Sequence, residues 1–160
     1  MQTLTATLAR ALQYFFHTPA TGALAPDFVL KDVRGHDLRL PEYRGDTVVT
    51  LFWASWRRHC RESLSQVNAI ASLSGVDAPV LLAVNLDGDA GRAAAVAASP
   101  HLSFPTLADA KQSVGRVYRV DGPAAHVAGR SRWPGVRRLW AGDTNSMPEL
   151  ARQIKELQSQ

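Results

Sequence analysis

The run Thr-Val-Val-Thr-Leu-Phe-Trp at residues 47–53 constrains the fold of this 160-residue chain more than any other segment. Four β-branched residues, a leucine and two aromatic residues follow one another in it with no charged residue among them, as is typical of a strand buried on both faces. Residues 79–86 (Pro-Val-Leu-Leu-Ala-Val-Asn-Leu) form a second run of the same character. Strands of this kind belong to sheets that helices cover on both sides, so we expect an α/β domain.

The remaining elements follow from hydrophobic periodicity and from turn residues. We expect short strands at 28–30 and 38–40 around a tight turn at 32–36, and a strand pair at 124–128 and 135–140. Helices are expected at about 56–73, 90–98, 111–119 and 147–157. The inner face of the helix at 56–73 would carry Leu64, Val67, Ile70 and Ala71. The result is a mixed central sheet flanked by helices, with an N-terminal β-hairpin.

The first 22 residues are expected to form an amphipathic helix and a linker, and residues 23–160 the domain. Apolar residues stand at helical spacing in this segment: Leu4, Leu8, Leu12, Phe15 and Phe16. Such a helix packs on the body or on a partner; the alternatives are a membrane-surface anchor through residues 1–16 and a degenerate secretory signal. The basic start and unbroken apolar stretch of a secretory signal are not found there, and no run is long enough to span a bilayer.

Charge and cysteine content exclude several classes of site. The net charge of +4 and the pI of about 9.7 favour acidic partners, but no basic stripe interleaved with aromatic residues indicates nucleic-acid binding. The single cysteine, Cys60, excludes an intrachain disulfide and a cysteine-rich zinc site. The histidines show no metal-ligand spacing, so we expect no metal site. We also expect no cofactor.

Three segments, taken in order, resemble the thioredoxin-like redoxins of the TlpA/ResA type, which are related to the AhpC/TSA proteins. The first is Ala-Pro-Asp-Phe at 25–28 with Leu-Pro-Glu-Tyr-Arg-Gly at 40–45. The second is Phe-Trp-Ala-Ser-Trp-Arg-Arg-His-Cys-Arg at 52–61, and the third is Val-Asp-Gly-Pro at 120–123. The resemblance implies a thioredoxin-like fold over about residues 23–157, with a cis peptide bond before Pro123. It also implies a family that is usually extracytoplasmic in bacteria, although the localisation of this chain stays open.

The chain departs from that family at its reaction centre. The resemblance places the attacking cysteine at Arg57 and the resolving cysteine at Cys60. The glutamate that the family carries three residues after the second cysteine is Ser63 here. Because disulfide exchange needs one thiolate to attack and a second thiol to release the product, we expect no dithiol chemistry.

Three interpretations of Cys60 remain open. It is an inert, buried small hydrophobe, or a monothiol that forms mixed disulfides, or the thiol of a one-cysteine peroxidase and antioxidant. The peroxidase interpretation lacks support at Arg57, because peroxiredoxins have a threonine three residues before the cysteine. Accessibility of the sulfur would separate an active thiol from an inert one.

The candidate binding site lies around the start of the helix at 56–73. Its predicted members are Trp56, Arg57, Arg58, His59, Arg61, Gly122 and Pro123. The arginines either point into solvent or hold a small anion against the amides of the helix start. The groove between Trp56 and Pro123 would hold a peptide. Asp-Gly-Asp at 87–89 is expected to be a loop and a helix cap rather than an ion site.

Two functions from different classes are compatible with this sequence. One is a non-catalytic or monothiol thioredoxin-fold module that binds a peptide or an anionic ligand. The other is an atypical one-cysteine oxidoreductase or antioxidant that acts through Cys60.

Overall fold

A seven-stranded mixed sheet forms the centre of the chain. The computed structural model describes residues 25–56, 60, 64–69, 79–98, 102–118, 120, 125–130, 136–140 and 152. The strands are β1 (Val29–Asp32), β2 (Asp37–Arg39), β3 (Thr47–Trp53), β4 (Val80–Asn85), β5 (Thr106–Ala108), β6 (Ala125–Arg130) and β7 (Val136–Trp140). Helical segments are η1 (Leu40–Tyr43), α3 (Ala90–Ala97) and α4 (Ser113–Val117), and Cys60 and residues 64–69 are helical too. The predicted α/β class is confirmed.

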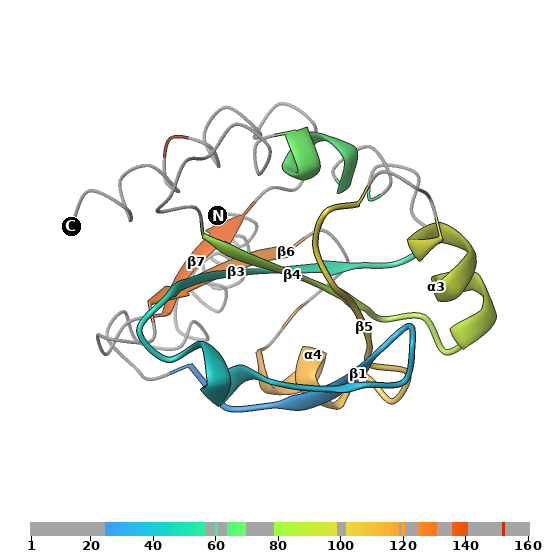
Figure 1. Cartoon of the computed structure of the whole chain (residues 1–160), viewed down its shortest axis with the longest axis horizontal. Coiled ribbons are helices and arrows are strands. Elements are labelled where there is room, and N and C mark those ends of the chain that lie inside the picture. The colour runs from blue at the N-terminus through green and yellow to red at the C-terminus, as the bar shows by residue number, and fades with distance from the viewer. Residues whose placement is uncertain are drawn as a thin grey trace, which may run out of the picture.

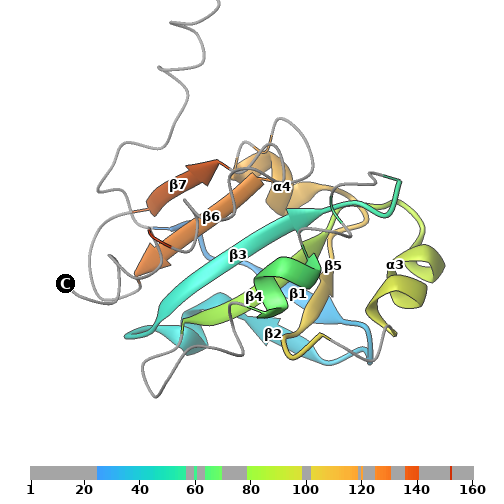
Figure 2. The same cartoon turned by 90° about the horizontal axis from the view of Figure 1, so that it is seen from above.

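The sheet has the order β2-β1-β5-β4-β3-β6-β7, which Figure 2 shows face on. β3 pairs in parallel with β4, from Val48 opposite Val80 to Trp53 opposite Asn85. On its other side β3 pairs antiparallel with β6, and β4 pairs in parallel with β5. The two apolar runs of the sequence are therefore neighbours in the interior of the sheet.

Alternate side chains of β3 enter two different apolar layers, because successive residues of a strand point to opposite faces. Val49, Leu51 and Trp53 belong to the layer that contains Cys60. Val48 and Phe52 belong to the layer that contains Tyr118. In Figure 1 the green helical turn at 64–69 lies above the sheet and α4 lies below it. We call the apolar cluster that contains Cys60 the Cys60 layer and the cluster that contains Tyr118 the Tyr118 layer.

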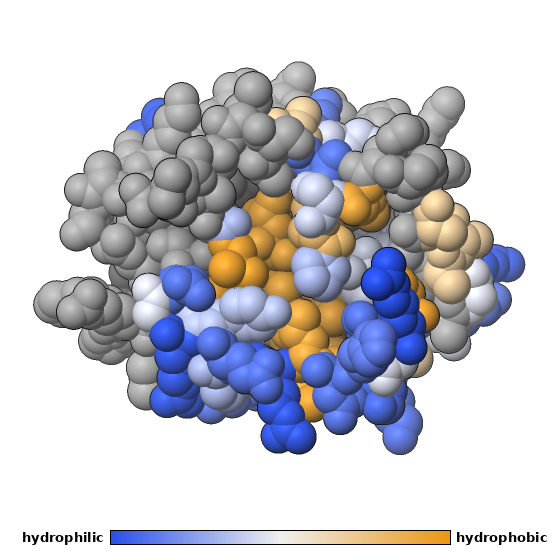
Figure 3. Space-filling view, in the orientation of Figure 1, coloured by the Kyte–Doolittle hydropathy of each residue, from blue (hydrophilic) through white to orange (hydrophobic). Residues whose placement is uncertain are grey.

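The β1–β2 hairpin closes through the tight turn that the sequence predicts. Asp32 Oδ1 accepts hydrogen bonds from the backbone N–H groups of Arg34 and His36, each at 2.8 Å. Gly35 has a φ of +86°, in the left-handed region that glycine enters without a steric penalty. Figure 3 shows polar residues along β1 and its turn, below a band of apolar residues in the middle of this face.

Several elements differ from the sequence-based expectation. The sequence does not predict β5, because three residues are too few to show a strand period. Leu40 begins the 3-10 helix η1 rather than ending a strand, since Pro41 favours a helix start. α4 is shorter than the predicted helix at 111–119.

The predicted helices in residues 1–22 and, apart from Arg152, at 147–157 lie outside the described residues. No helix in the described part is both long and apolar enough to cross a membrane.

Candidate functional site

The site begins where β3 ends. The Leu86 N–H donates to the Trp53 carbonyl oxygen at 2.9 Å and continues the β3–β4 pairing one step beyond the strands. After Trp53 the chain leaves the sheet through Ala54 and turns at Ser55 and Trp56. Because the carboxyl ends of parallel strands meet at one edge, this turn lies beside the residues that follow β4.

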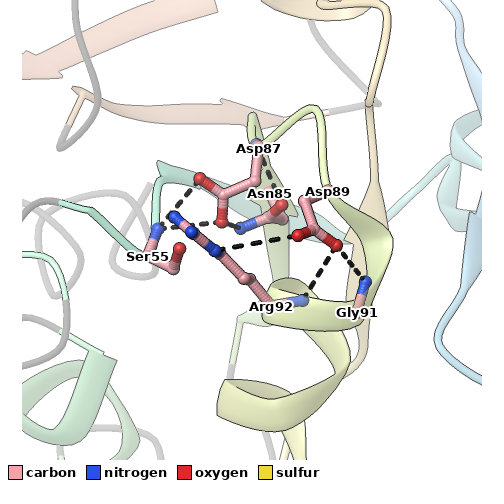
Figure 4. A network of polar contacts seen from close by, with 6 residues as sticks. All are labelled: Ser55, Asn85, Asp87, Asp89, Gly91 and Arg92. Carbon is pink, nitrogen blue, oxygen red and sulfur yellow. Dashed lines mark hydrogen bonds and ion pairs between the residues drawn. The ribbon is translucent and has the colours of Figure 1, made fainter.

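A buried carboxylate connects the two strand ends, as Figure 4 shows. The Ser55 N–H donates to Asp87 Oδ2 at 2.9 Å and to Oδ1 at 3.1 Å. Asn85 Nδ2 donates to the same Asp87 Oδ2 at 2.8 Å, and the Asp87 N–H donates back to Asn85 Oδ1 at 2.9 Å. Asn85 and Asp87 are 1% and 5% exposed. We call this arrangement the Asp87 clasp.

Asp89, two residues further on, has the role that the sequence predicts for this loop. Its Oδ1 accepts hydrogen bonds from the N–H groups of Gly91 at 2.8 Å and Arg92 at 3.4 Å. These bonds satisfy amides at the start of α3, which is the function of a helix cap. The predicted cap is confirmed for Asp89, whereas Asp87 has a different role that the sequence pattern did not indicate.

Trp56 presents an apolar surface next to the clasp. It is 62% exposed, compared with 56% for Val117 and 51% for Val29. Trp53, three residues earlier, is fully buried, as expected for a core residue. Its Nε1 is the one buried side-chain nitrogen or oxygen with no hydrogen-bond partner among the described residues.

Cys60 is buried, with an exposed fraction of 1%. Its neighbours in the Cys60 layer are Val49, Leu51, Trp53, Leu64, Val67, Leu81, Ala83 and Phe104. Leu64 and Val67 take the inner positions that the sequence predicts for the helix, whereas Ile70 and Ala71 lie outside the described residues. A thiol in this environment is closed to a substrate disulfide unless the layer opens.

The other predicted site residues are Arg57, Arg58, His59, Arg61, Gly122 and Pro123, and all of them lie outside the described residues. The predicted groove, anion site and cis peptide bond therefore stay predictions. Among the described residues, no group of three or more histidine, cysteine, aspartate or glutamate side chains could hold a metal ion.

Comparisons with known proteins agree with the fold. The model of the AhpC/TSA family matches residues 21–133. The thiol-disulfide oxidoreductase ResA of Geobacillus kaustophilus is 35% identical over 101 residues, which are 63% of this chain and 58% of that protein. The thioredoxin-like protein YneN of Bacillus subtilis is 31% identical over 93 residues, 56% of this chain and 54% of that protein. The chain thus spans less than two thirds of these relatives.

Solved structures extend the similarity over more of the chain. A protein of Chlorobium tepidum, provisionally assigned as the thiol:disulfide interchange protein DsbE, superposes with a TM-score of 0.79 at 27% identity. That match covers 86% of this chain and 97% of the other. The pneumococcal exposed lipoprotein thioredoxin Etrx1 of Streptococcus pneumoniae superposes with a TM-score of 0.67 at 26% identity, over 82% and 99% of the two chains.

Proposed function

Because the chain belongs to the AhpC/TSA family and is a thioredoxin-like redoxin of the ResA type, we propose that it is a binding module that has kept the fold of its family without dithiol exchange. It binds a peptide segment on the surface that carries Trp56. The burial of Cys60, the only cysteine, is the observation that supports this proposal most directly.

The chemistry of exchange argues against turnover. A reductase of this kind uses an exposed thiolate to attack and a second thiol to resolve the mixed disulfide. By resemblance to the family motif, the attacking position holds Arg57, and Cys60 is buried in an apolar layer. A one-cysteine peroxidase acting through Cys60 is the alternative, and it needs the sulfur to reach solvent. The 1% exposure of Cys60 disfavours it.

The surface argues for binding. Tryptophan is enriched among the residues that contribute most to protein interfaces, and Trp56 is well exposed beside a rigid buried clasp. Arg57, Arg58 and Arg61 follow it in the sequence, and arginine is suited to carboxylates. We therefore propose a peptide in which an apolar side chain packs on Trp56 and an acidic residue or other anion pairs with these arginines.

An insulin-reduction assay with dithiothreitol tests the loss of exchange. We expect the wild-type protein to give the uncatalysed rate. Acceleration by the wild type that disappears in Cys60→Ser would contradict the proposal. Arg57→Cys is the informative variant, because it restores the attacking thiol, although Ser63 in place of the family's glutamate should keep any recovered rate low.

A peptide selection tests the binding function. Random cysteine-free peptides displayed on phage are selected on the wild-type protein and counter-selected on Trp56→Ala. We expect enriched sequences that combine apolar and acidic residues, with Trp56→Ala weakening a selected peptide at least about tenfold. Val117→Ala is the matched control, because Val117 is also exposed but belongs to α4, whose Val114 packs in the Tyr118 layer. If no sequence is enriched over Trp56→Ala, the proposal is wrong.

A further inference from the structure

Two buried aspartates follow neighbouring parallel strands and hold backbone amides in different ways. Asp109 follows β5, is 2% exposed and accepts bonds from the N–H groups of Ser113 at 2.9 Å and Gly115 at 2.8 Å. Those amides belong to α4, a few residues further along the chain. Asp87 follows β4 and instead accepts the amide of Ser55, which lies 32 residues earlier. Asp109 therefore anchors its own helix, and Asp87 anchors a distant turn.

The Asp87 carboxylate is itself held firmly. Asn85 donates to one of its oxygens and accepts from its backbone N–H, so the two residues fix each other's orientation. Both Asp87 oxygens lie within bonding distance of the Ser55 N–H. Hydrogen bonds to an ionised carboxylate are stronger than neutral ones, and exclusion from water strengthens them further.

The clasp ends one residue before Trp56. The backbone of Ser55 is tied to the sheet edge, and the next side chain is the 62% exposed indole. An aromatic side chain binds best when its position is set before the partner arrives, because less conformational freedom is lost on binding. We propose that Asp87 is a positioning residue of the binding face and holds the Ser55–Trp56 turn so that Trp56 is presented to the peptide.

The positioning role rests on the proposed peptide binding, whereas the position of the Ser55–Trp56 turn depends only on the Asp87 clasp. Asp87→Asn keeps the size of the side chain but replaces one accepting oxygen with a donating NH₂ group. In the position of Oδ2 that group would face both the Ser55 N–H and Asn85 Nδ2, and in the position of Oδ1 it would face the Ser55 N–H; all of these groups are donors. At least one contact between Asp87 and the Ser55 N–H is then lost, and the Ser55–Trp56 turn is held less firmly.

Fluorine NMR of protein labelled with fluorotryptophan tests the proposal without any ligand. The Trp56 resonance is assigned with Trp56→Phe. In Asp87→Asn we expect this resonance to shift or broaden, and a peptide selected on the wild type to bind about tenfold more weakly. Asp109→Asn is the matched control, because it removes an equally buried carboxylate that holds amides of α4. It should leave both the resonance and the affinity unchanged.

The outcomes separate the two proposals. An unchanged Trp56 resonance in folded Asp87→Asn would overturn the positioning role, whatever the affinity does. A shifted resonance in a protein that selects no peptide would support the clasp and contradict the binding function. If Asp87→Asn does not fold, Asn85→Ala replaces it, since that variant keeps the Asp87–Ser55 bond and removes the group that orients it. Asn85→Ala should move the resonance in the same direction by a smaller amount.

Discussion

At the scale of single residues, the burial of Cys60 decides how its thiol should react. The side chain is 1% exposed within an apolar layer, so a reagent reaches the sulfur only when that layer opens. We expect labelling by a chromogenic disulfide to be slow in the native protein and immediate in guanidinium chloride. Added urea below the unfolding midpoint should accelerate labelling in step with the unfolded fraction. Rapid labelling of the native protein would contradict the sealed thiol and revive the one-cysteine alternative.

Trp53 offers a second prediction at this scale. Its indole is fully buried, and Nε1 has no hydrogen-bond partner among the described residues. Trp53→Phe leaves a cavity, but it also removes an unsatisfied donor whose burial costs about 1–3 kcal/mol. We therefore expect the free energy of unfolding to fall by about 1 kcal/mol or less.

The comparison for Trp53→Phe is Phe52→Leu, on the same strand and also fully buried, but in the Tyr118 layer. That change leaves a cavity without removing an unsatisfied polar group. We therefore expect it to lower the free energy of unfolding by more, about 1–2 kcal/mol. Urea unfolding followed by circular dichroism gives both values. A greater loss in Trp53→Phe would show that its indole N–H is satisfied after all.

At the scale of elements, the sequence predicts strands better than it predicts the contacts between their ends. The bounds of β3 match the expected run at 47–53, because β-branched and then large apolar residues follow one another there without a charged or turn residue. β5 is too short to be seen in the sequence and is stabilised by its pairing with β1 and β4. The sequence does not indicate the Asp87 clasp for a related reason, since Asp-Gly-Asp is typical of a loop and Ser55 is remote in sequence.

The prediction at this scale concerns Tyr118, which connects the end of α4 to the segment before β1. The Tyr118 ring packs against Phe28, with ring centres 6.0 Å apart, and its hydroxyl donates to the Pro26 carbonyl oxygen at 2.6 Å. Burial, and then the nearby Asp27 carboxylate, raise the pKa of Tyr118. Tyr118→Phe should cost about 1 kcal/mol at neutral pH through the lost hydrogen bond.

The pH dependence of this variant follows from the same pKa. A group whose pKa is raised in the folded state contributes stability that is complete below its unfolded pKa, about 10 for tyrosine, and declines as the pH rises above it. The wild type should therefore lose more stability than Tyr118→Phe when urea unfolding is repeated above pH ~10. The other tyrosines titrate in both proteins and cancel. Equal alkaline losses would place the Tyr118 hydroxyl in solvent.

At the scale of the whole molecule, β3 and β4 contribute to both apolar layers, so the layers should unfold together. Leu64 belongs to the Cys60 layer and Leu82 to the Tyr118 layer, and both are nearly fully buried. Leu64→Ala and Leu82→Ala should each cost about 2–5 kcal/mol. Each should also keep a single transition in which circular dichroism and fluorescence coincide. Separate transitions in either variant would mean that the sheet does not couple its two faces.

The same sheet has a consequence for how the protein is made. Two of its ladders join residues that are far apart along the chain, with Lys31 opposite Ala108 and Thr47 opposite Arg130. Pairing over such separations is slow, because a long loop must close before any contact is gained. During synthesis the apolar strand β3 therefore has one open edge until Arg130 has left the ribosome. In that interval the nascent chain is most exposed to aggregation and has most to gain from a chaperone.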